Sequence, residues 1–450
     1  MSSLVLNPYK TQLKSQNCVI PKTVFVVLCL TILVPRAIIA GRTVGLDDIL
    51  SIFLWPVMLT YYIAHKESLF KGHKLIFVWD LLLLQGIMCG IFGSLLFFGE
   101  LSLPTEMWQY VKRMAFFYMS VYWAWSERIS SEYVYKVLLW VLIFAAFLGL
   151  LQAAPWLDVG DDISRLYART ERQATMLIDR SFDSRRVFGV AGHSNSWGGF
   201  CVFITSLAIS SLLAGRWKQG KSKRSSTLLS GLLLSIGLFN VILSGSRAAL
   251  LALITVFAFF TGLQILSKKH AISNLVKFFS IIAAMYLGAS YYMHERIEYI
   301  IYRYTVLVDT INYGAGRVKQ VNDAIGLLDG LYAYIFGVGN ATQRHMATSY
   351  GTEVEPIYLL VNYGIVGIVL RYSIVLIISI YAYRLWKFSR GADQVLAGAT
   401  IGAVVGYAVF SMGYFFFQEL YVGTIPWLLF GWVVGRYYRK QEEITKSRCV

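Results

Sequence analysis

Apolar runs of about 20 residues recur along the whole chain, and no other feature restricts its fold so strongly. A helical run of that length crosses the hydrocarbon core of a bilayer and satisfies its own backbone hydrogen bonds there. Hydrophobic residues make up 57% of the 450 and charged residues only 15%, so much of the apolar surface must face lipid. The sequence therefore predicts an all-α integral membrane protein, with residues 1–450 forming one polytopic domain.

The spacing of the runs predicts about twelve transmembrane helices, the first of them an uncleaved span and not a signal peptide. The predicted spans are residues 22–40, 46–64, 74–98, 107–126, 133–153, 188–214, 227–244, 247–266, 271–293, 356–385, 394–417 and 420–437. Two longer segments, residues 154–187 and 294–355, interrupt this rhythm, and each carries short amphipathic helical patterns.

The distribution of positive charge predicts the orientation of the spans. Short cytoplasmic loops of membrane proteins collect Lys and Arg, and with both termini in the cytoplasm every second short loop obeys this rule. The predicted cytoplasmic cations include Lys66, Lys71, Arg128, Arg216, Lys218, Lys221, Lys268, Lys269, Arg384, Lys387, Arg390, Arg436, Arg439 and Lys440. The net charge of +16 is explained by these loops, so it does not indicate nucleic-acid binding. Residues 154–187 and 294–355 then lie on the side of the membrane opposite the cytoplasm.

The first long segment is rich in arginine. Arg165, Arg169 and Arg172 follow one another at i, i+4 and i+7, which places them on one face of a helix, and Arg186 leads into the next span. Arginine suits phosphate because its planar guanidinium stays charged and forms paired hydrogen bonds. The same pattern fits an interfacial helix that binds anionic lipid headgroups. Both interpretations stay open from the residues alone.

Two further arginines stand at the starts of helical patterns on the same predicted side. Arg247 follows the small-residue turn 244–246 between two spans, and Arg317 follows a glycine in the second long segment. Each fits a phosphate contact, or equally a solvated side chain at a membrane end. The nearby "GVGN", residues 337–340, predicts a turn with exposed backbone amides, but it lacks the spacing of a nucleotide-binding fingerprint.

Acidic residues collect where the second long segment meets the next apolar run, in "EVEPIYLLVNYGIVG". Glu353 and Glu355 are expected to face the outer aqueous side, and Pro356 suits the first position of a helix. A carboxylate at a helix N-terminus is favoured by the helix dipole, which explains the pattern as a cap. The functional interpretation is a general base close to the arginines.

Polar residues also occur at the outer end of the sixth predicted span and inside the fourth. His193 and Asn195 either bind sugar hydroxyls or satisfy one another's hydrogen bonds between helices. Lys112 and Arg113 either extend to the lipid headgroups or point into an interior cavity. The chain has no HExxH motif, no DxD pair in an outer segment and no P-loop. The sequence therefore predicts no metal site and no cofactor.

The order of several motifs resembles that of one known family. These motifs are "GRTVGLDDILSI", "RVFGVAGHSNSWGGF", "LSGSRAALLAL", "GAGRVKQVNDAI", "FGVGN" and "VEPIYLLVNYGIVG". Together, over residues 42–370, they resemble the superfamily of O-antigen ligases and Wzy-type O-antigen polymerases. The resemblance implies a membrane-embedded, metal-independent, inverting glycosyltransferase whose donor is a glycan on undecaprenyl pyrophosphate.

The resemblance also implies roles for individual residues. Arg186, Arg247 and Arg317 would contact the pyrophosphate and glycan, with the further arginines and His193 and Asn195 as candidate substrate contacts. Ligases of the family have a His-Asn pair where this chain has Glu355-Pro356. The resemblance therefore favours a polymerase, with Glu355, or otherwise Glu353, as the base that activates the acceptor hydroxyl.

The implied partners are the lipid-linked glycan donor and acceptor, membrane lipids, a chain-length regulator and a flippase. Two alternatives remain. A ligase would transfer the finished glycan to lipid A-core. A transporter or flippase would move a lipid-linked oligosaccharide or a small anion, and it would use ionisable residues inside the spans, such as Asp80 and Arg371.

Overall fold

The structure is a computed structural model. It describes residues 19–39, 42–64, 74–101, 105–153, 159–168, 186–214, 221–266, 280, 291, 294, 298, 301–302, 317–339, 341–342, 353–415 and 424–448.

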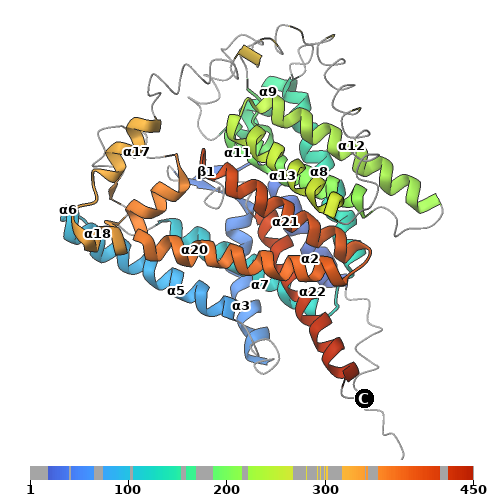
Figure 1. The fold of residues 1–450 in the computed structure, drawn as a ribbon, viewed down its shortest axis with the longest axis horizontal. Helices are drawn as coiled ribbons and strands as arrows, with labels where there is room; N and C mark the ends of the chain where they lie inside the picture. Colours follow the sequence, from blue (N-terminus) through green and yellow to red (C-terminus); the bar gives the residue numbers. More distant parts are fainter. Residues whose placement is uncertain are drawn as a thin grey trace, which may run out of the picture.

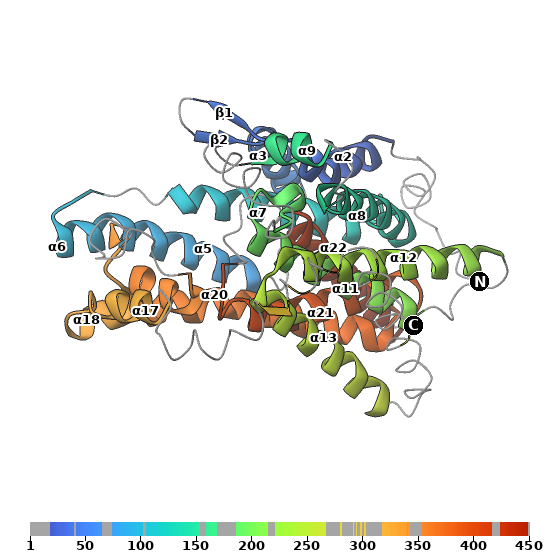
Figure 2. The same cartoon turned by 90° about the horizontal axis from the view of Figure 1, so that it is seen from above.

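Helices dominate the described chain, with one small β-hairpin at the edge of the bundle (Figures 1 and 2). In the N-terminal half the elements are α2 (Val19–Leu30), η1 (Thr31–Leu33), β1 (Ala37–Ile39), β2 (Arg42–Val44), α3 (Leu46–Ala64), α5 (Lys74–Met88), the π-helix η2 (Cys89–Gly93), α6 (Ser94–Phe98), α7 (Thr105–Trp125), α8 (Ser131–Ala153) and α9 (Val159–Tyr167). They continue with η4 (Gly189–Ala191), α11 (Ser194–Leu213), α12 (Lys221–Ser244), α13 (Arg247–Leu266), α17 (Arg317–Ile325), α18 (Gly330–Phe336), α20 (Glu355–Phe388), α21 (Ala392–Phe410) and α22 (Thr424–Arg448).

Seven helices of the described chain are long and apolar enough to cross a membrane. They are Val78–Phe98, Ser131–Ala153, Ser194–Ala214, Thr227–Ser244, Arg247–Ile265, Glu355–Phe388 and Ala392–Phe410. The chain is therefore a multi-pass, mainly helical membrane protein. The full set of predicted spans is not confirmed, because α3, α7 and α22 are helices at predicted positions but are not among these seven, and most of the predicted span 271–293 lies outside the described residues.

The first predicted span, 22–40, is too long. Helix ends at Leu33, and Val34 has the extended conformation (φ −88°, ψ 121°) that a residue before a proline prefers. The chain then forms an antiparallel hairpin in which β1 pairs with β2. This hairpin is the departure from the predicted all-α class within the described residues.

The predicted span 356–385 is not one straight helix. Gly364 has φ 66° and ψ −173°, and the carboxylate of Glu355 lies 3.6 Å from the guanidinium of Arg371. Sixteen residues of straight helix would separate those positions by about 24 Å. The chain therefore folds back at Gly364, and we call residues 355–363 the leading segment and residues 365–388 the long segment of α20.

The backbone groups released by this break find partners in the turn after α18. The amides of Val338 and Gly339 donate to the carbonyls of Val361 (2.8 Å) and Asn362 (3.2 Å), and the side chain of Gln85 donates to Tyr363. Such pairing is needed wherever a helix breaks at membrane depth. The amides predicted to be exposed in "GVGN" are thus used within the fold, beside the folded-back end of α20 (Figure 1).

The core forms around α11, which packs against α12, α13 and α21, while α7 packs along α22. At one end of this bundle the amide of Val187 donates to Leu243 at the end of α12 (3.1 Å). There the amide of Glu355 also donates to Ser411 at the end of α21 (3.0 Å). We call this the site end, because α11, α13 and α20 all begin there.

The opposite end is built from the starts of α8 and α21 and the far part of α22. Ser131 and Arg436 both bind Asp393 there, and Ser210 at the end of α11 donates to Val395 (2.8 Å). The described cations that were predicted to be cytoplasmic, among them Arg128, Arg384, Arg390, Arg436 and Arg439, belong to this end, which we call the cationic end.

Candidate functional site

A cavity of about 270 Å³ opens at the site end. Its lining residues are Arg186, His193, Asn195, Gly245, Ser246, Arg247, Ala248 and Glu353. We call it the arginine cavity. It brings two arginines, an imidazole, an amide and a carboxylate together from three separate parts of the sequence, and each of these side chains was a candidate from the sequence.

The turn between α12 and α13 forms one wall. Gly245 has φ 57°, a left-handed conformation that disfavours other residues, and a Cβ placed on it would come within 3.3 Å of the Arg186 Nε. Ser246 immediately precedes α13 as its N-cap, and its hydroxyl accepts a weak bond from the amide of Ala249 (3.4 Å). The motif Ser-Gly-Ser thus turns the chain tightly, leaves room for a guanidinium and sets Arg247 at the first position of α13.

Arg186 is held by two hydrogen bonds. Its Nε donates to the carbonyl of Ser244 (2.7 Å), and its Nη2 donates to the Oδ1 of Asn195 (2.7 Å). A guanidinium is planar, so two bonds at different nitrogens fix the plane as well as the position. Asn195 therefore orients the guanidinium of Arg186.

The start of α11 forms the second wall. His193 has an extended backbone before the helix, and its carbonyl accepts the first helical bond, from Trp197 (2.9 Å). Its ring stacks on Tyr414 with a centroid distance of 5.0 Å and an interplanar angle of 8°. Stacking on Tyr414 holds the imidazole at the cavity wall.

Glu353 supplies the carboxylate of the cavity and comes from the chain just before α20. It is half-buried, and its amide donates to the side chain of Gln320 on α17 (3.5 Å). Arg317 is the first residue of α17 and lies one helical turn before Gln320, on the same face. The backbone of Arg317 is therefore one helical turn from the residue that binds the amide of Glu353, while the side chain of Arg317 lies outside what the structure describes.

The electrostatics of the arginine cavity favour an anion. The N-termini of α11, α13 and α20 all lie at the site end, and each carries the positive end of a helix dipole. Arg186 and Arg247 add two full positive charges against the single negative charge of Glu353. The arrangement can bind a phosphate-bearing group and hold a carboxylate next to it.

Glu355 is not in this cavity. It begins α20 as predicted, but its side chain is fully buried and faces Arg371, so the expectation that it faces water is wrong. The guanidinium of Arg371 also lies over the ring of Tyr110, 4.3 Å from its centroid. The two carboxylates are adjacent to the N-terminus of one helix in sequence, but Glu353 lines the cavity and Glu355 lies in the interior of the bundle.

Of the arginine face predicted for the first long segment, only Arg165 falls within the described residues. Helix α9 ends at Tyr167, Ala168 has no helical assignment, and Arg165 is exposed on α9. Arg169 and Arg172 themselves lie outside the described residues.

A buried ionic network, which sequence reasoning missed, lies near the start of α3. Lys112 contacts Asp47 (2.6 Å) and Asp48 (2.7 Å), and Arg36 contacts Asp47 (2.9 Å). Lys112 and Arg113 each expose only 1% of their surface, so neither side chain extends to the lipid headgroups. The only signal in the sequence was the acidic pair Asp47-Asp48 inside "GLDDILSI", which is far from Lys112 along the chain but contacts it in the fold. In the part of the chain that the structure describes, no group of three His, Cys, Asp or Glu side chains could hold a metal ion.

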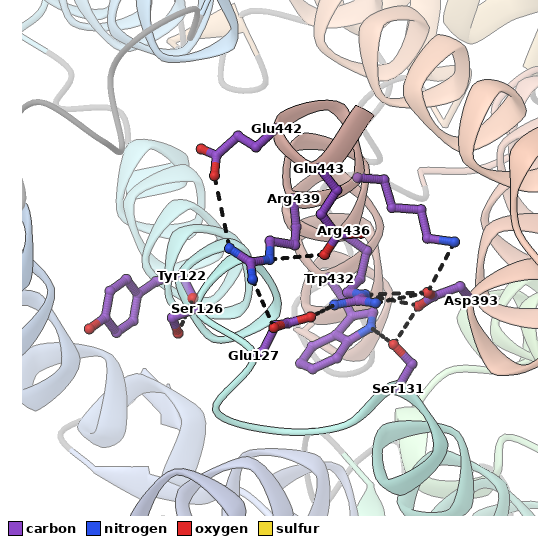
Figure 3. Close-up of polar contacts among 11 residues, drawn as sticks. Tyr122, Ser126, Glu127, Ser131, Asp393, Trp432, Arg436, Arg439, Glu442 and Glu443 are labelled. Carbon is purple, nitrogen blue, oxygen red and sulfur yellow. Dashed lines mark hydrogen bonds and ion pairs between the residues drawn. The ribbon is translucent and has the colours of Figure 1, made fainter. Parts of the chain in front are cut away.

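A second cavity, of about 250 Å³, lies at the cationic end and includes Glu127, Asp393 and Arg436 in its lining (Figure 3). Arg436 binds both carboxylates, and Arg439 binds Glu127 at 3.0 Å. Glu127 adopts a left-handed backbone (φ 56°) to meet them. These charges neutralise one another, so the cluster ties α7, α21 and α22 together and is the weaker candidate for a ligand site.

A comparison of the chain with models of known protein families finds no match, and a search of characterised proteins finds none either. The geometry of the arginine cavity is therefore the main evidence on function.

Proposed function

We propose that this protein is a polysaccharide polymerase that joins undecaprenyl-pyrophosphate-linked oligosaccharide repeats at the periplasmic face of a bacterial inner membrane. One observation carries the proposal: Arg186, Arg247 and Glu353 share a cavity at the end of the bundle opposite the cation-rich loops. This glycosyl transfer requires a group that binds the anionic pyrophosphate and a nearby carboxylate that accepts a proton. The order of motifs described above supplies the substrate class.

The two arginines and the helix N-termini would bind the pyrophosphate of the donor. As the bond between the anomeric carbon and the pyrophosphate oxygen breaks, its electron pair goes to that oxygen. Positive groups already in place stabilise the negative charge that develops there. The fixed plane of Arg186 favours this role, because electrostatic stabilisation depends on groups that do not have to reorganise.

Glu353 would act as the general base. An acceptor sugar hydroxyl attacks the anomeric carbon from the side opposite the leaving group, forms the new C–O bond and gives its proton to the carboxylate. Such a reaction inverts the anomeric configuration. Glu353 replaces Glu355 as the first candidate, because Glu353 lines the cavity and Glu355 is buried against Arg371.

The orientation rests on the positive-inside rule. If the cationic end, with Arg128, Arg390 and Arg436, faces the cytoplasm, the arginine cavity faces the periplasm, where lipid-linked repeats are assembled after flipping. Donor and acceptor would both be held by their lipids in the same membrane, which makes their encounter effectively intramolecular. A flippase would supply the substrates, and a chain-length regulator is the expected protein partner.

Deletion of the gene tests the proposal. A polymerase deletion should leave surface glycan that ends after a single repeat unit, and a normal long-chain ladder would contradict the proposal. If the deletion instead removes all glycan from lipid A-core and lipid-linked polymer accumulates, the protein is a ligase. Elongation of extracted lipid-linked repeats by the purified protein in detergent is the positive control for polymerase activity.

A transporter is the second candidate, and two observations favour it. Helix α20 is broken at Gly364, and the pairs Glu355–Arg371 and Lys112–Asp47 are buried, as ionisable groups of transporters often are. Movement of labelled lipid-linked oligosaccharide or of phosphate across proteoliposomes would identify this activity. Elongation in detergent, where no compartments exist, would exclude transport as the main activity.

A further inference from the structure

We infer that the buried Glu355–Arg371 ion pair is a positioning device, which holds Glu353 in the arginine cavity by fixing the fold-back of α20. The inference rests on the proposed function, because it takes Glu353 as the reacting carboxylate. Glu355 and Arg371 are positioning residues: neither lines the cavity, and their side chains are 0% and 1% exposed.

The pair joins the two segments of α20. Glu355 is the first residue of the leading segment, Arg371 lies in the long segment, and their side chains meet at 3.6 Å across the hairpin. Arg371 is fixed on its other side by the ring of Tyr110 on α7. The pair therefore sets the register of the leading segment relative to the long segment of α20 and to α7.

The backbone around Glu353 is fixed on both sides. Its own amide is held by Gln320 of α17, and two residues later the amide of Glu355 is held by Ser411 of α21. With the Glu355 side chain anchored to Arg371, the stretch 353–355 is tied to three different elements. A shift of the leading segment along the long segment would move the Glu353 carboxylate relative to Arg186 and Arg247.

Stability alone is a poor explanation for the pair. A buried ion pair loses the hydration of both charges, so replacing both partners by neutral groups of similar size is often neutral for stability. An ion pair instead favours one arrangement of its two segments. An apolar contact can slide at a small cost in free energy, whereas separating buried opposite charges has a large one. Among the side chains of the leading segment, Ile357, Leu360 and Val361 pack in an apolar cluster around α17 and α18, and such a cluster does not by itself fix a register.

The test compares three forms of the full-length protein in detergent: wild type, the double variant Glu355→Gln/Arg371→Gln, and a matched control. The control, Asp393→Asn/Arg436→Gln, removes another ion pair at the cationic end. Removing both charges avoids an unpaired buried charge, so the double variant is expected to fold. Size-exclusion profiles and thermal unfolding check that it does.

The first measurement does not depend on activity. Glu353→Cys is introduced into each form, in a background where Cys18 and Cys449 are serine, and its reaction with a charged methanethiosulfonate reagent is timed with and without inorganic pyrophosphate. In the wild-type form pyrophosphate should slow the reaction. In the double variant the rate should change at least several-fold and the protection by pyrophosphate should be lost. The control should behave like wild type.

The second measurement uses elongation of lipid-linked repeats extracted from the deletion strain, with Glu353 intact. The double variant should lose about 10²-fold in kcat, the size of effect seen when a reacting group is displaced by about 1 Å, while the donor KM changes little. A pair that only stabilises the fold would leave kcat at the wild-type value.

The outcomes separate the two claims. Wild-type thiol kinetics and wild-type kcat in the double variant would overturn the positioning role and leave the proposed function standing. If the wild-type protein elongates nothing, the proposed function fails, and the thiol measurement still decides whether the pair positions residue 353. A double variant that does not fold, beside a control that does, would show a structural role and also overturn the inference.

Discussion

Replacement of Gly364 by alanine tests the fold-back of α20 directly. The residue has φ 66° and ψ −173°, a region that is essentially restricted to glycine and costs another residue about 1–3 kcal/mol. A Cβ there would also overlap the carbonyl of Ile335 and come within 2.5 Å of the amide nitrogen of Phe336. To relieve that overlap, the two segments of α20 and α18 have to separate by about 1 Å. Overpacking of this kind typically destabilises a folded protein by about 1–3 kcal/mol.

Strain and overlap together predict that Gly364→Ala destabilises the protein by about 2–6 kcal/mol. Gly262→Ala is the matched control. Gly262 lies within α13, a Cβ on it would meet nothing within 4 Å, and alanine in a helix is favoured over glycine by about 0.5–1 kcal/mol. The assay is thermal unfolding of the purified proteins in detergent, in which the two substitutions should shift the midpoint in opposite directions.

A spectroscopic measurement checks the geometry itself. Spin labels at positions 355 and 371 should show strong dipolar broadening, because the native side chains meet at 3.6 Å. A straight helix would place the labelled positions about 24 Å apart and leave the spectrum unbroadened. An unbroadened spectrum in a protein changed only at the two labelled positions, together with a Gly364→Ala variant as stable as Gly262→Ala, would refute the fold-back.

Three further predictions concern the cavity and the buried charges. Arg186→Ala or Arg247→Ala should each weaken binding of inorganic pyrophosphate, measured by calorimetry, by about 10- to 100-fold, the value of a charge-assisted hydrogen bond; unchanged affinity in both would argue against an anion site. Glu353→Gln should lower kcat for elongation by about 10²- to 10⁴-fold without weakening pyrophosphate binding, and wild-type turnover would remove its role as base. Lys112→Met should destabilise the fold by about 3–5 kcal/mol because it leaves two buried carboxylates to share the single cation Arg36, whereas Lys136→Ala, in an exposed pair, should cost less than about 1 kcal/mol in the same unfolding assay.

Prediction from sequence succeeded where the signal is local. The helix over 46–64 was predicted to the residue, and so was the one over 247–266, because a run of apolar residues defines a span without reference to other parts of the chain. The position of Arg247 at the start of its helix followed from the turn residues before it in the same way. The first span was predicted too long because the break at Pro35 was not used, although its signal is local as well.

Prediction failed where partners are distant in sequence. Gly364 stands in an apolar run and gives no local sign that the helix breaks there, because its break is stabilised by the turn at 337–339 and by Gln85. The ionic network has the same property, since Lys112 and Asp47 are 65 residues apart. Neither contact leaves a periodic pattern that sequence reasoning can read.

Hydropathy and residue chemistry are properties of short stretches, so the residues alone indicate a membrane protein, the positions of most of its helices and the charged candidates for a site. How those candidates divide between the cavity and the interior depends on contacts between distant parts of the chain. Glu353 and Glu355 are two residues apart and equally acidic on paper, yet the fold-back at Gly364 brings Arg371 to Glu355 and leaves Glu353 facing Arg186 and Arg247. The physical reason is that a buried carboxylate needs a cation within a few ångströms, and only folding decides which of the two receives it.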